Sequence, residues 1–133
     1  MTTYHLTVTG APRTKKTSNR LVKVGRFRKV LPSKAWEHWV KHARVQGTMD
    51  ATDMTWHYTE RMLPLAVPLH ITAIFYRDAR RGDLVGYMQG LADLLEKRGV
   101  IANDRQLVNW DGTRLDLDRD NPRTEVTLTE VSE

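Results

Sequence analysis

Two aspartates flank a stretch of apolar residues with helical spacing, and they are the first candidates for chemistry. Asp83 stands where a helix would begin, and Asp104 follows Gly99 at the point where the chain would enter a strand. Hard cations such as Mg²⁺ are held by one or two carboxylates together with water and phosphate oxygens. The pair is therefore a candidate divalent-metal site if the fold brings the carboxylates within about 5 Å. The alternatives are a helix cap for Asp83 and a turn for Asp104.

Three further acids are alternatives for a third ligand. Asp93 lies ten residues into the helix, about 15 Å along its axis from Asp83, which is too far to share one ion. Asp111 precedes Gly112, and this dipeptide predicts a hairpin turn. Asp78 lies in the loop before Asp83 and is close enough in sequence to fold back.

The second chemical feature is a basic N-terminal segment. Residues 1–36 hold nine Lys or Arg and no acid, whereas the other 97 residues hold twelve basic and sixteen acidic residues. Such asymmetry is typical of a protein that binds a polyanion, and a solvated loop is the alternative. The candidate phosphate contacts are Arg13, Lys15, Lys16, Arg20, Arg26, Arg28, Lys29 and Lys34, with Arg80 and Arg81 from the loop before Asp83.

The composition bounds the class of protein. The 133 residues suit one domain, 1–133, and no apolar run approaches the roughly 20 residues needed to cross a bilayer. The chain has no cysteine, which excludes disulfides, thiolate metal sites and cysteine nucleophiles and suits a reducing cytoplasm. We expect no membrane partner and no small-molecule cofactor.

Hydrophobic periodicity predicts an α+β fold. Alternation over residues 4–8, 69–76 and 124–128 predicts strands, the second of them buried on both faces. Residues 106–110 and 113–117 are expected to pair as a hairpin around Asp111 and Gly112. Residues 13–31 of the basic segment are expected to be a long loop with a short hairpin near Gly25, and residues 46–62 an irregular connection.

Two helices complete the predicted domain. Ser33 is the expected N-cap of the first, whose stripe of Trp36, Trp39, Val40 and Ala43 faces the core. The second begins after Asp83 and ends before Gly99. The prediction is a single domain with a mixed or antiparallel sheet of four to five strands and two main helices, in the order β-α-β-α-β-β.

The motifs, taken in order, resemble the RusA family of Holliday junction resolvases over nearly the whole chain. The residues that carry the resemblance are Gly10-Ala-Pro12-Arg13-Thr14-Lys15-Lys16, Pro32-Ser33-Lys34-Ala35-Trp36 with Trp39, Phe75-Tyr76, Arg80-Arg81-Gly82-Asp83, Asp93, Gly99-Val100-Ile101, Asp104 and Gln106. The resemblance implies a bacterial or prophage-encoded, cytoplasmic endonuclease that cuts branched DNA with Mg²⁺. Asp83 and Asp104 match the family's metal-binding acids, and symmetric cutting of a four-way junction implies a homodimer.

Four positions depart from the family's active-site block. Val85 replaces an aspartate, Gly86 an asparagine, Gln89 a lysine, and Asn103 the first acid of an Asp-Asp pair. The first expectation is therefore a metal-dependent endodeoxyribonuclease of recombination and repair. The second is a catalytically inactive relative that binds branched DNA as a structural or regulatory module.

Overall fold

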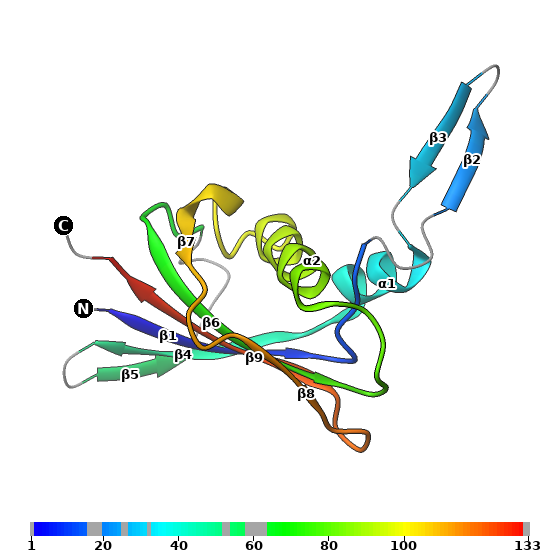
Figure 1. The fold of residues 1–133 in the computed structure, drawn as a ribbon. Helices are drawn as coiled ribbons and strands as arrows, with labels where there is room; N and C mark the ends of the chain where they lie inside the picture. Colours follow the sequence, from blue (N-terminus) through cyan, green and yellow to red (C-terminus); the bar gives the residue numbers. More distant parts are fainter. Residues whose placement is uncertain are drawn as a thin grey trace.

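A seven-stranded mixed sheet and a separate two-stranded hairpin hold the strands of this α+β fold (Figure 1). The structure is a computed structural model, and it describes residues 2–15, 20–24, 27–31, 33–51, 54–57 and 64–131. The strands of the large sheet are β1 (Thr3–Thr9), β4 (Val45–Ala51), β5 (Met54–His57), β6 (Leu69–Arg77), β7 (Leu107–Asn109), β8 (Arg114–Leu117) and β9 (Arg123–Glu130). The predicted class and the two main helices are confirmed.

Antiparallel pairing forms one side of the sheet and parallel pairing forms its other edge. The order is β5-β4-β1-β9-β6-β7, and β8 also pairs with β6. β9 lies between β1 and β6 and is antiparallel to both. The phenol of Tyr4 on β1 donates a hydrogen bond to Glu130 on β9 at 3.0 Å, which ties the first and last strands together.

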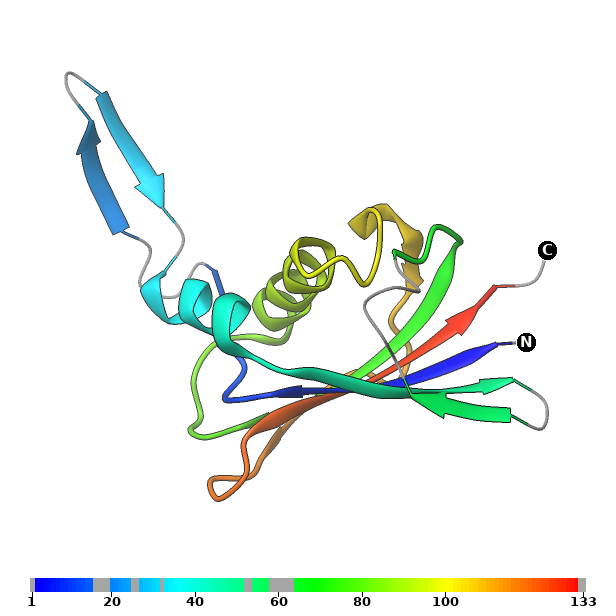
Figure 2. The ribbon, with the colours of Figure 1, turned by 180° about the vertical axis from the view of Figure 1, so that it is seen from behind.

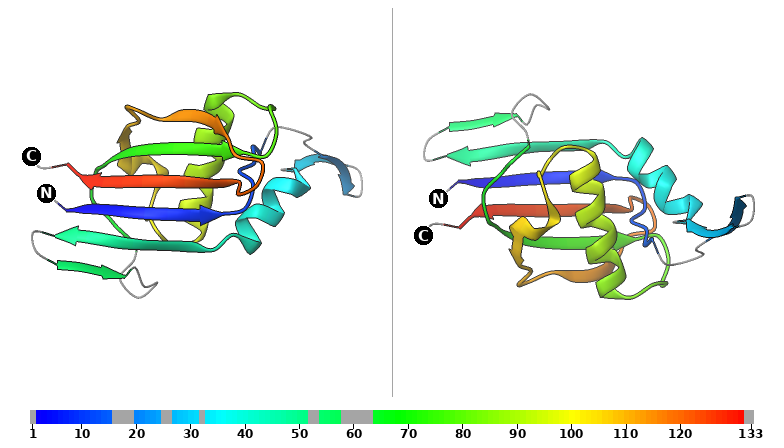
Figure 3. Two further views of the ribbon diagram at one scale, coloured as in Figure 1. Left: turned by 90° about the horizontal axis from the view of Figure 1, so that it is seen from below. Right: turned by 90° about the horizontal axis from the view of Figure 1, so that it is seen from above.

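The two helices pack on one face of the sheet. Figure 3 shows α2 (Leu84–Lys97) lying across the strands, with α1 (Lys34–His42) near one end of the sheet. Alternate residues of the central strands face α2 and are buried, among them Val8, Ile71, Phe75 and Leu128. This core of strand and helix side chains fixes the position of α2, and with it the acids that α2 carries.

The helices contact each other through specific polar groups as well as apolar ones. Ser33 caps α1, as predicted, and Trp36 and Trp39 are buried in the core. The indole of Trp36 donates to the backbone carbonyl of Gly90 in α2 at 3.1 Å. The guanidinium of Arg98, just after α2, donates to the carbonyl of Val40 at 3.1 Å near the C-terminal end of α1. Cations and donors at a helix C-terminus satisfy its free carbonyls.

Three predictions about the strands are wrong. Residues 45–51 and 54–57 form β4 and β5 rather than an irregular connection; residues 58–63 lie outside the described part. β7 and β8 do not form a hairpin, because both run parallel to β6 and lie one after the other along its edge. Nor is β6 buried on both faces, since His70 is exposed and Ile74 is only partly buried on the face that the helices leave open. The sheet therefore has more strands than the predicted four to five.

The basic segment forms a hairpin that projects from the domain. β2 (Arg20–Val24) pairs with β3 (Phe27–Leu31), and Figures 1 and 2 show this hairpin standing clear of the large sheet. At its base, the backbone N–H of Ser33 donates to the carbonyl of Lys15, and the Ser33 hydroxyl donates to the carbonyl of Thr14. These bonds join the chain segment before the hairpin to the segment after it. Among the described residues, no helix is long and apolar enough to cross a membrane.

Candidate functional site

Asp83 caps α2. Its backbone is extended, and its carboxylate accepts a hydrogen bond from the backbone N–H of Gly86 at 2.7 Å. A carboxylate in this position satisfies one of the free N–H groups at the start of the helix and complements the positive end of the helix dipole. The alternative role considered for Asp83 is thus the one that the geometry displays.

Asp104 lies beyond the opposite end of α2. Gly99 adopts a left-handed conformation, with φ 74°, and turns the chain away from the helix. The chain then forms a short 3₁₀ turn, η2 (Asp104–Gln106), which Asn103 caps. The side chain of Gln106 accepts from the Asn103 N–H at 2.7 Å and donates to the carbonyl of Leu65 at 2.7 Å. The backbone that carries Asp104 is therefore fixed, while its side chain is exposed.

The fold does not join Asp83 to Asp104. A helix of the length of α2 rises about 21 Å, and the two aspartates lie beyond its opposite ends. Instead, the carboxylate of Asp104 lies with those of Asp93 and Glu96, and one oxygen from each is within 4.8 Å of the others. We call these three residues the acidic triad. Asp93 is one of the predicted alternative acids, whereas Glu96 is not, although its i,i+3 spacing from Asp93 places both on one helix face.

The other alternative acids have structural partners. Asp78 pairs with Arg81 at 2.6 Å and with Arg13 at 3.5 Å. Asp111 lies in the bend between β7 and β8, where its N–H donates to the side chain of Asn109 at 2.7 Å. These contacts give both residues roles in loops, away from the acidic triad.

The acidic triad suits a hard divalent cation. Opposite ligands of an octahedral Mg²⁺ lie about 4 Å apart, and those of the larger Ca²⁺ about 5 Å apart. The three oxygens lie within 4.8 Å of one another, so a small closure of the side chains would bring them to the spacing of ligands on one Ca²⁺, Mg²⁺ or Mn²⁺. Glu96 and Asp104 are exposed, so water or a phosphate can complete the coordination shell.

Lys15 connects the basic segment to the acidic triad. Its ammonium lies 2.9 Å from the carboxylate of Asp93 and 4.9 Å from the ring centre of Trp36. The side chain of Lys15 is 32 % exposed and that of Asp93 19 % exposed, so the pair is partly shielded from water. The ammonium neutralises one of the three carboxylates and would compete with a metal ion for it.

The remaining predicted phosphate contacts fall into three groups. Lys34 is exposed at the start of α1, and Arg13 and Arg81 pair with Asp78. Arg20, Arg28 and Lys29 lie on β2 and β3, where only the backbone is described. Lys16 and Arg26 lie outside the described residues.

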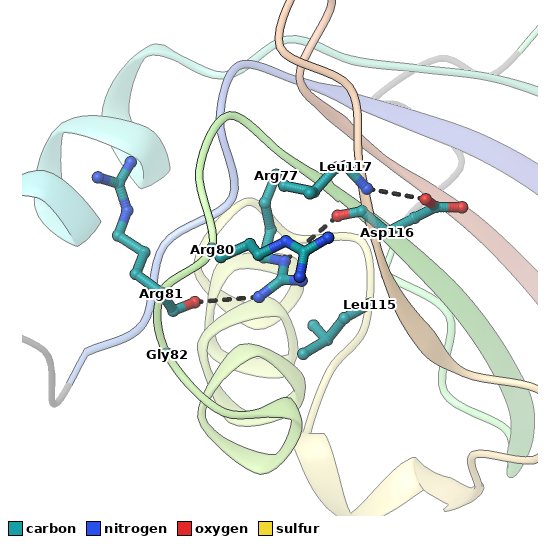
Figure 4. Close-up of a pocket in the computed structure, with 7 residues that line it drawn as sticks. All are labelled: Arg77, Arg80, Arg81, Gly82, Leu115, Asp116 and Leu117. Carbon is teal, nitrogen blue, oxygen red and sulfur yellow. Dashed lines mark hydrogen bonds between the residues drawn. The ribbon is translucent and has the colours of Figure 1, made fainter.

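Arg80 lines a hollow that the sequence did not predict as a unit. The hollow has a volume of about 450 Å³ and lies between the loop that follows β6 and the strand β8 (Figure 4). Its lining residues are Arg77, Arg80, Arg81, Gly82, Leu115, Asp116 and Leu117. Arg77 was not among the predicted contacts. The signal for it is its position as the last residue of β6, directly before the arginine-rich loop.

Tyr87 supports the wall of this hollow from within the core. Its hydroxyl donates to the carbonyl of Arg81 at 2.7 Å, and its ring is almost fully buried against Phe75. Burial raises the pKa of Tyr87, and the nearby cations Arg77, Arg81 and Arg13 oppose that rise. The phenol therefore stays neutral and keeps its proton for the bond that holds the loop.

No protein-family model matches this chain, and a search of curated proteins finds no significant match. The function is therefore inferred from the geometry of the fold. It provides three carboxylates at one end of α2, a lysine that joins them to the basic segment, and an arginine-lined hollow near the other end of α2.

Proposed function

We propose that the protein is a divalent-metal-dependent endonuclease that acts on branched DNA, with Asp93, Glu96 and Asp104 as the metal ligands. The observation that carries the proposal is the convergence of these three carboxylates next to Lys15, at the base of the basic segment. The proposal keeps the reaction and substrate that the resemblance to the RusA family implies. It moves the metal away from Asp83.

The acids and bases have complementary tasks in such a reaction. A divalent cation lowers the pKa of a bound water and neutralises charge on the phosphate that is cleaved. The acidic triad would hold that cation, since it offers oxygen ligands and an open side. Lys15 is then released from Asp93 and can pair with a phosphate oxygen of the substrate.

DNA binding rests on the charge of the N-terminal segment. Positions 1–36 contain nine basic residues and no acidic residue. The β2–β3 hairpin carries several of these basic residues away from the body. Contacts of this kind give affinity that is strongly salt-dependent and largely independent of sequence. Paired cuts in a four-way junction need two related sites, so the proposal includes a symmetric homodimer.

The second candidate function is a DNA-binding module without catalysis. The observation that favours it is that Lys15 already pairs with Asp93 and that Asp83 is engaged as a helix cap. In addition, Val85 is 69 % exposed at a position where the RusA-like block has an acid. On this reading the acidic triad is a solvated cluster.

A cleavage assay with matched variants separates the two functions. A synthetic four-way junction is incubated with the protein and Mg²⁺ or Mn²⁺, using the wild type, Asp104→Asn, Glu96→Gln and Asp83→Asn. We expect metal-dependent nicking that falls at least a hundredfold in Asp104→Asn and Glu96→Gln and persists in Asp83→Asn, which keeps a good cap.

Binding of the same junction is measured alongside, because removing one carboxylate leaves the basic segment intact. Tight binding without nicking in either metal would refute the nuclease and support the DNA-binding module. If nicking is lost in Asp83→Asn but persists in Asp104→Asn and Glu96→Gln, the metal ligand is Asp83 and not the acidic triad. Neither binding nor nicking would refute both functions.

A further inference from the structure

The arginine-lined hollow is separate from the acidic triad. It lies at the end of β6 beside Gly82, directly before the N-cap of α2, whereas Asp93 is ten residues along the helix. Ten residues of helix correspond to about 15 Å. Whatever binds in the hollow is therefore not held by the three carboxylates.

Arg77 is held in place by backbone carbonyls rather than by an acid. Its Nε donates to the carbonyl of Asp116 at 3.2 Å, and its Nη1 donates to the carbonyl of Arg81 at 3.3 Å (Figure 4). A guanidinium has five N–H donors, so these two bonds fix its orientation and leave donors for a ligand. No carboxylate pairs with it among the residues that the structure describes.

Arg80 adds a second cation to the same hollow. It is exposed and makes no hydrogen bond or ion pair within the described part of the chain. In Figure 4 its side chain extends toward Arg77, whereas that of Arg81 extends away toward α1. Arg81 is already paired with Asp78 at 2.6 Å, so Arg77 and Arg80 are the cations left to the hollow.

The acid that lines the hollow does not neutralise these cations. Figure 4 shows the carboxylate of Asp116 turned away from the arginines, and it accepts from the N–H of Leu117 at 2.8 Å. Two guanidinium groups that share a hollow without an anion repel each other. An oxyanion between them relieves that repulsion and takes up their remaining N–H donors, a geometry for which guanidinium is well suited.

We propose that this hollow binds a phosphate group through Arg77 and Arg80. The phosphate is either free, at the end of a nucleic-acid strand, or within the strand backbone, and the recognising chemistry is the same in each case. The inference does not rest on the proposed function, because it concerns a phosphate that lies away from the acidic triad.

The test uses Arg80→Gln, which removes an exposed side chain without structural contacts, and Arg44→Gln as its control. Arg44 is also exposed, its side chain makes no hydrogen bond or ion pair in the described part of the chain, and it lies between α1 and β4. Titration calorimetry measures binding of inorganic phosphate, a short 5′-phosphorylated oligonucleotide and the same oligonucleotide without that phosphate. We expect Arg80→Gln to weaken binding at least tenfold and Arg44→Gln to leave it within twofold.

The three probes identify the source of the phosphate. If Arg80→Gln weakens binding of inorganic phosphate and of the 5′-phosphorylated oligonucleotide, but not of the oligonucleotide without that phosphate, the hollow binds a free or terminal phosphate. If Arg80→Gln weakens binding of both oligonucleotides, and inorganic phosphate does not bind measurably, the hollow binds a phosphate of the strand backbone. Equal affinity of the wild type, Arg80→Gln and Arg44→Gln for every probe, or no binding of any probe, would overturn the inference, whether or not the protein cleaves DNA.

Discussion

At the scale of single residues, aspartates of one chemical type acquire different tasks from their local surroundings. Asp83 accepts a backbone N–H at the start of α2, whereas Asp93 on the same helix faces Lys15, Glu96 and Asp104. A carboxylate whose lone pairs serve a helix cap stabilises the fold. Carboxylates that lie close together repel one another, and a nearby cation such as Lys15 or a metal ion reduces that repulsion.

Substitutions at Asp83 separate the cap from a metal ligand. Asp83→Ala should lower the free energy of unfolding by about 1 kcal/mol, and Asp83→Asn should change it little, because asparagine caps nearly as well as aspartate. Denaturant unfolding measures both values. Neither substitution should change Mn²⁺ affinity, which Asp104→Asn should lower. A loss of Mn²⁺ affinity in Asp83→Asn would contradict the assignment of the metal to the acidic triad.

At the scale of elements, the close approach of α1 and α2 brings Lys15 to the acidic triad. The chain segment before the hairpin passes between the helices, where the carbonyl of Arg13 and the ring of Trp36 lie against Gly90. A Cβ at position 90 would lie 2.7 Å from the Arg13 carbonyl oxygen and 3.4 Å from the indole of Trp36. The absence of a side chain at Gly90 therefore sets the spacing between the two helices.

For Gly90→Ala, helix propensity and tertiary packing are expected to change the free energy of unfolding in opposite directions. Alanine favours an isolated helix over glycine by about 1 kcal/mol. Overpacking against rigid backbone costs about 1–3 kcal/mol, so we expect the substitution to lower the unfolding free energy overall. Thermal and denaturant unfolding measure the sign. A stabilised Gly90→Ala protein would show that the helices are not packed this closely.

At the scale of the whole molecule, basic residues are concentrated in the N-terminal segment that carries the projecting β2–β3 hairpin, and acidic residues lie in the rest of the chain. The β2–β3 hairpin belongs to a segment with no acid, and the rest of the chain carries more acids than bases. An isolated two-stranded hairpin is marginally stable in water, so a partner of opposite charge would stabilise it. A duplex major groove is wide enough to admit a two-stranded ribbon.

The hairpin charges predict a salt dependence for DNA binding. Replacing Arg28 and Lys29 together by glutamine should reduce the slope of log affinity against log salt by about 2, since each phosphate contact contributes about 0.9. Fluorescence anisotropy between about 50 and 200 mM salt measures this slope. The control replaces Lys41 and Arg44, which removes the same charge from exposed positions on the body. Equal slopes for the two double variants would exclude a specific role for the hairpin.

Much of the local structure was predictable because its signals lie close together in the sequence. The caps at Ser33 and Asp83, the left-handed Gly99 and the alternation in β1, β6 and β9 each depend on a few neighbouring residues. The α+β class follows from these elements. Residues 45–51 and 54–57 gave a weaker signal, because the pairing of β4 with β1 and with β5 supplies the order that their composition lacks.

The sequence by itself determined the two helices, their caps, the core-facing tryptophans of α1 and the separation of charge between the N-terminal segment and the rest. Only the tertiary structure decided which carboxylates meet, because a helix of about 21 Å separates residues that adjoin its two ends. It also decided that β7 and β8 run parallel to β6, and that Arg77 and Arg80 share one hollow. Such contacts depend on the direction that each chain segment takes after a turn, and no local pattern encodes that direction.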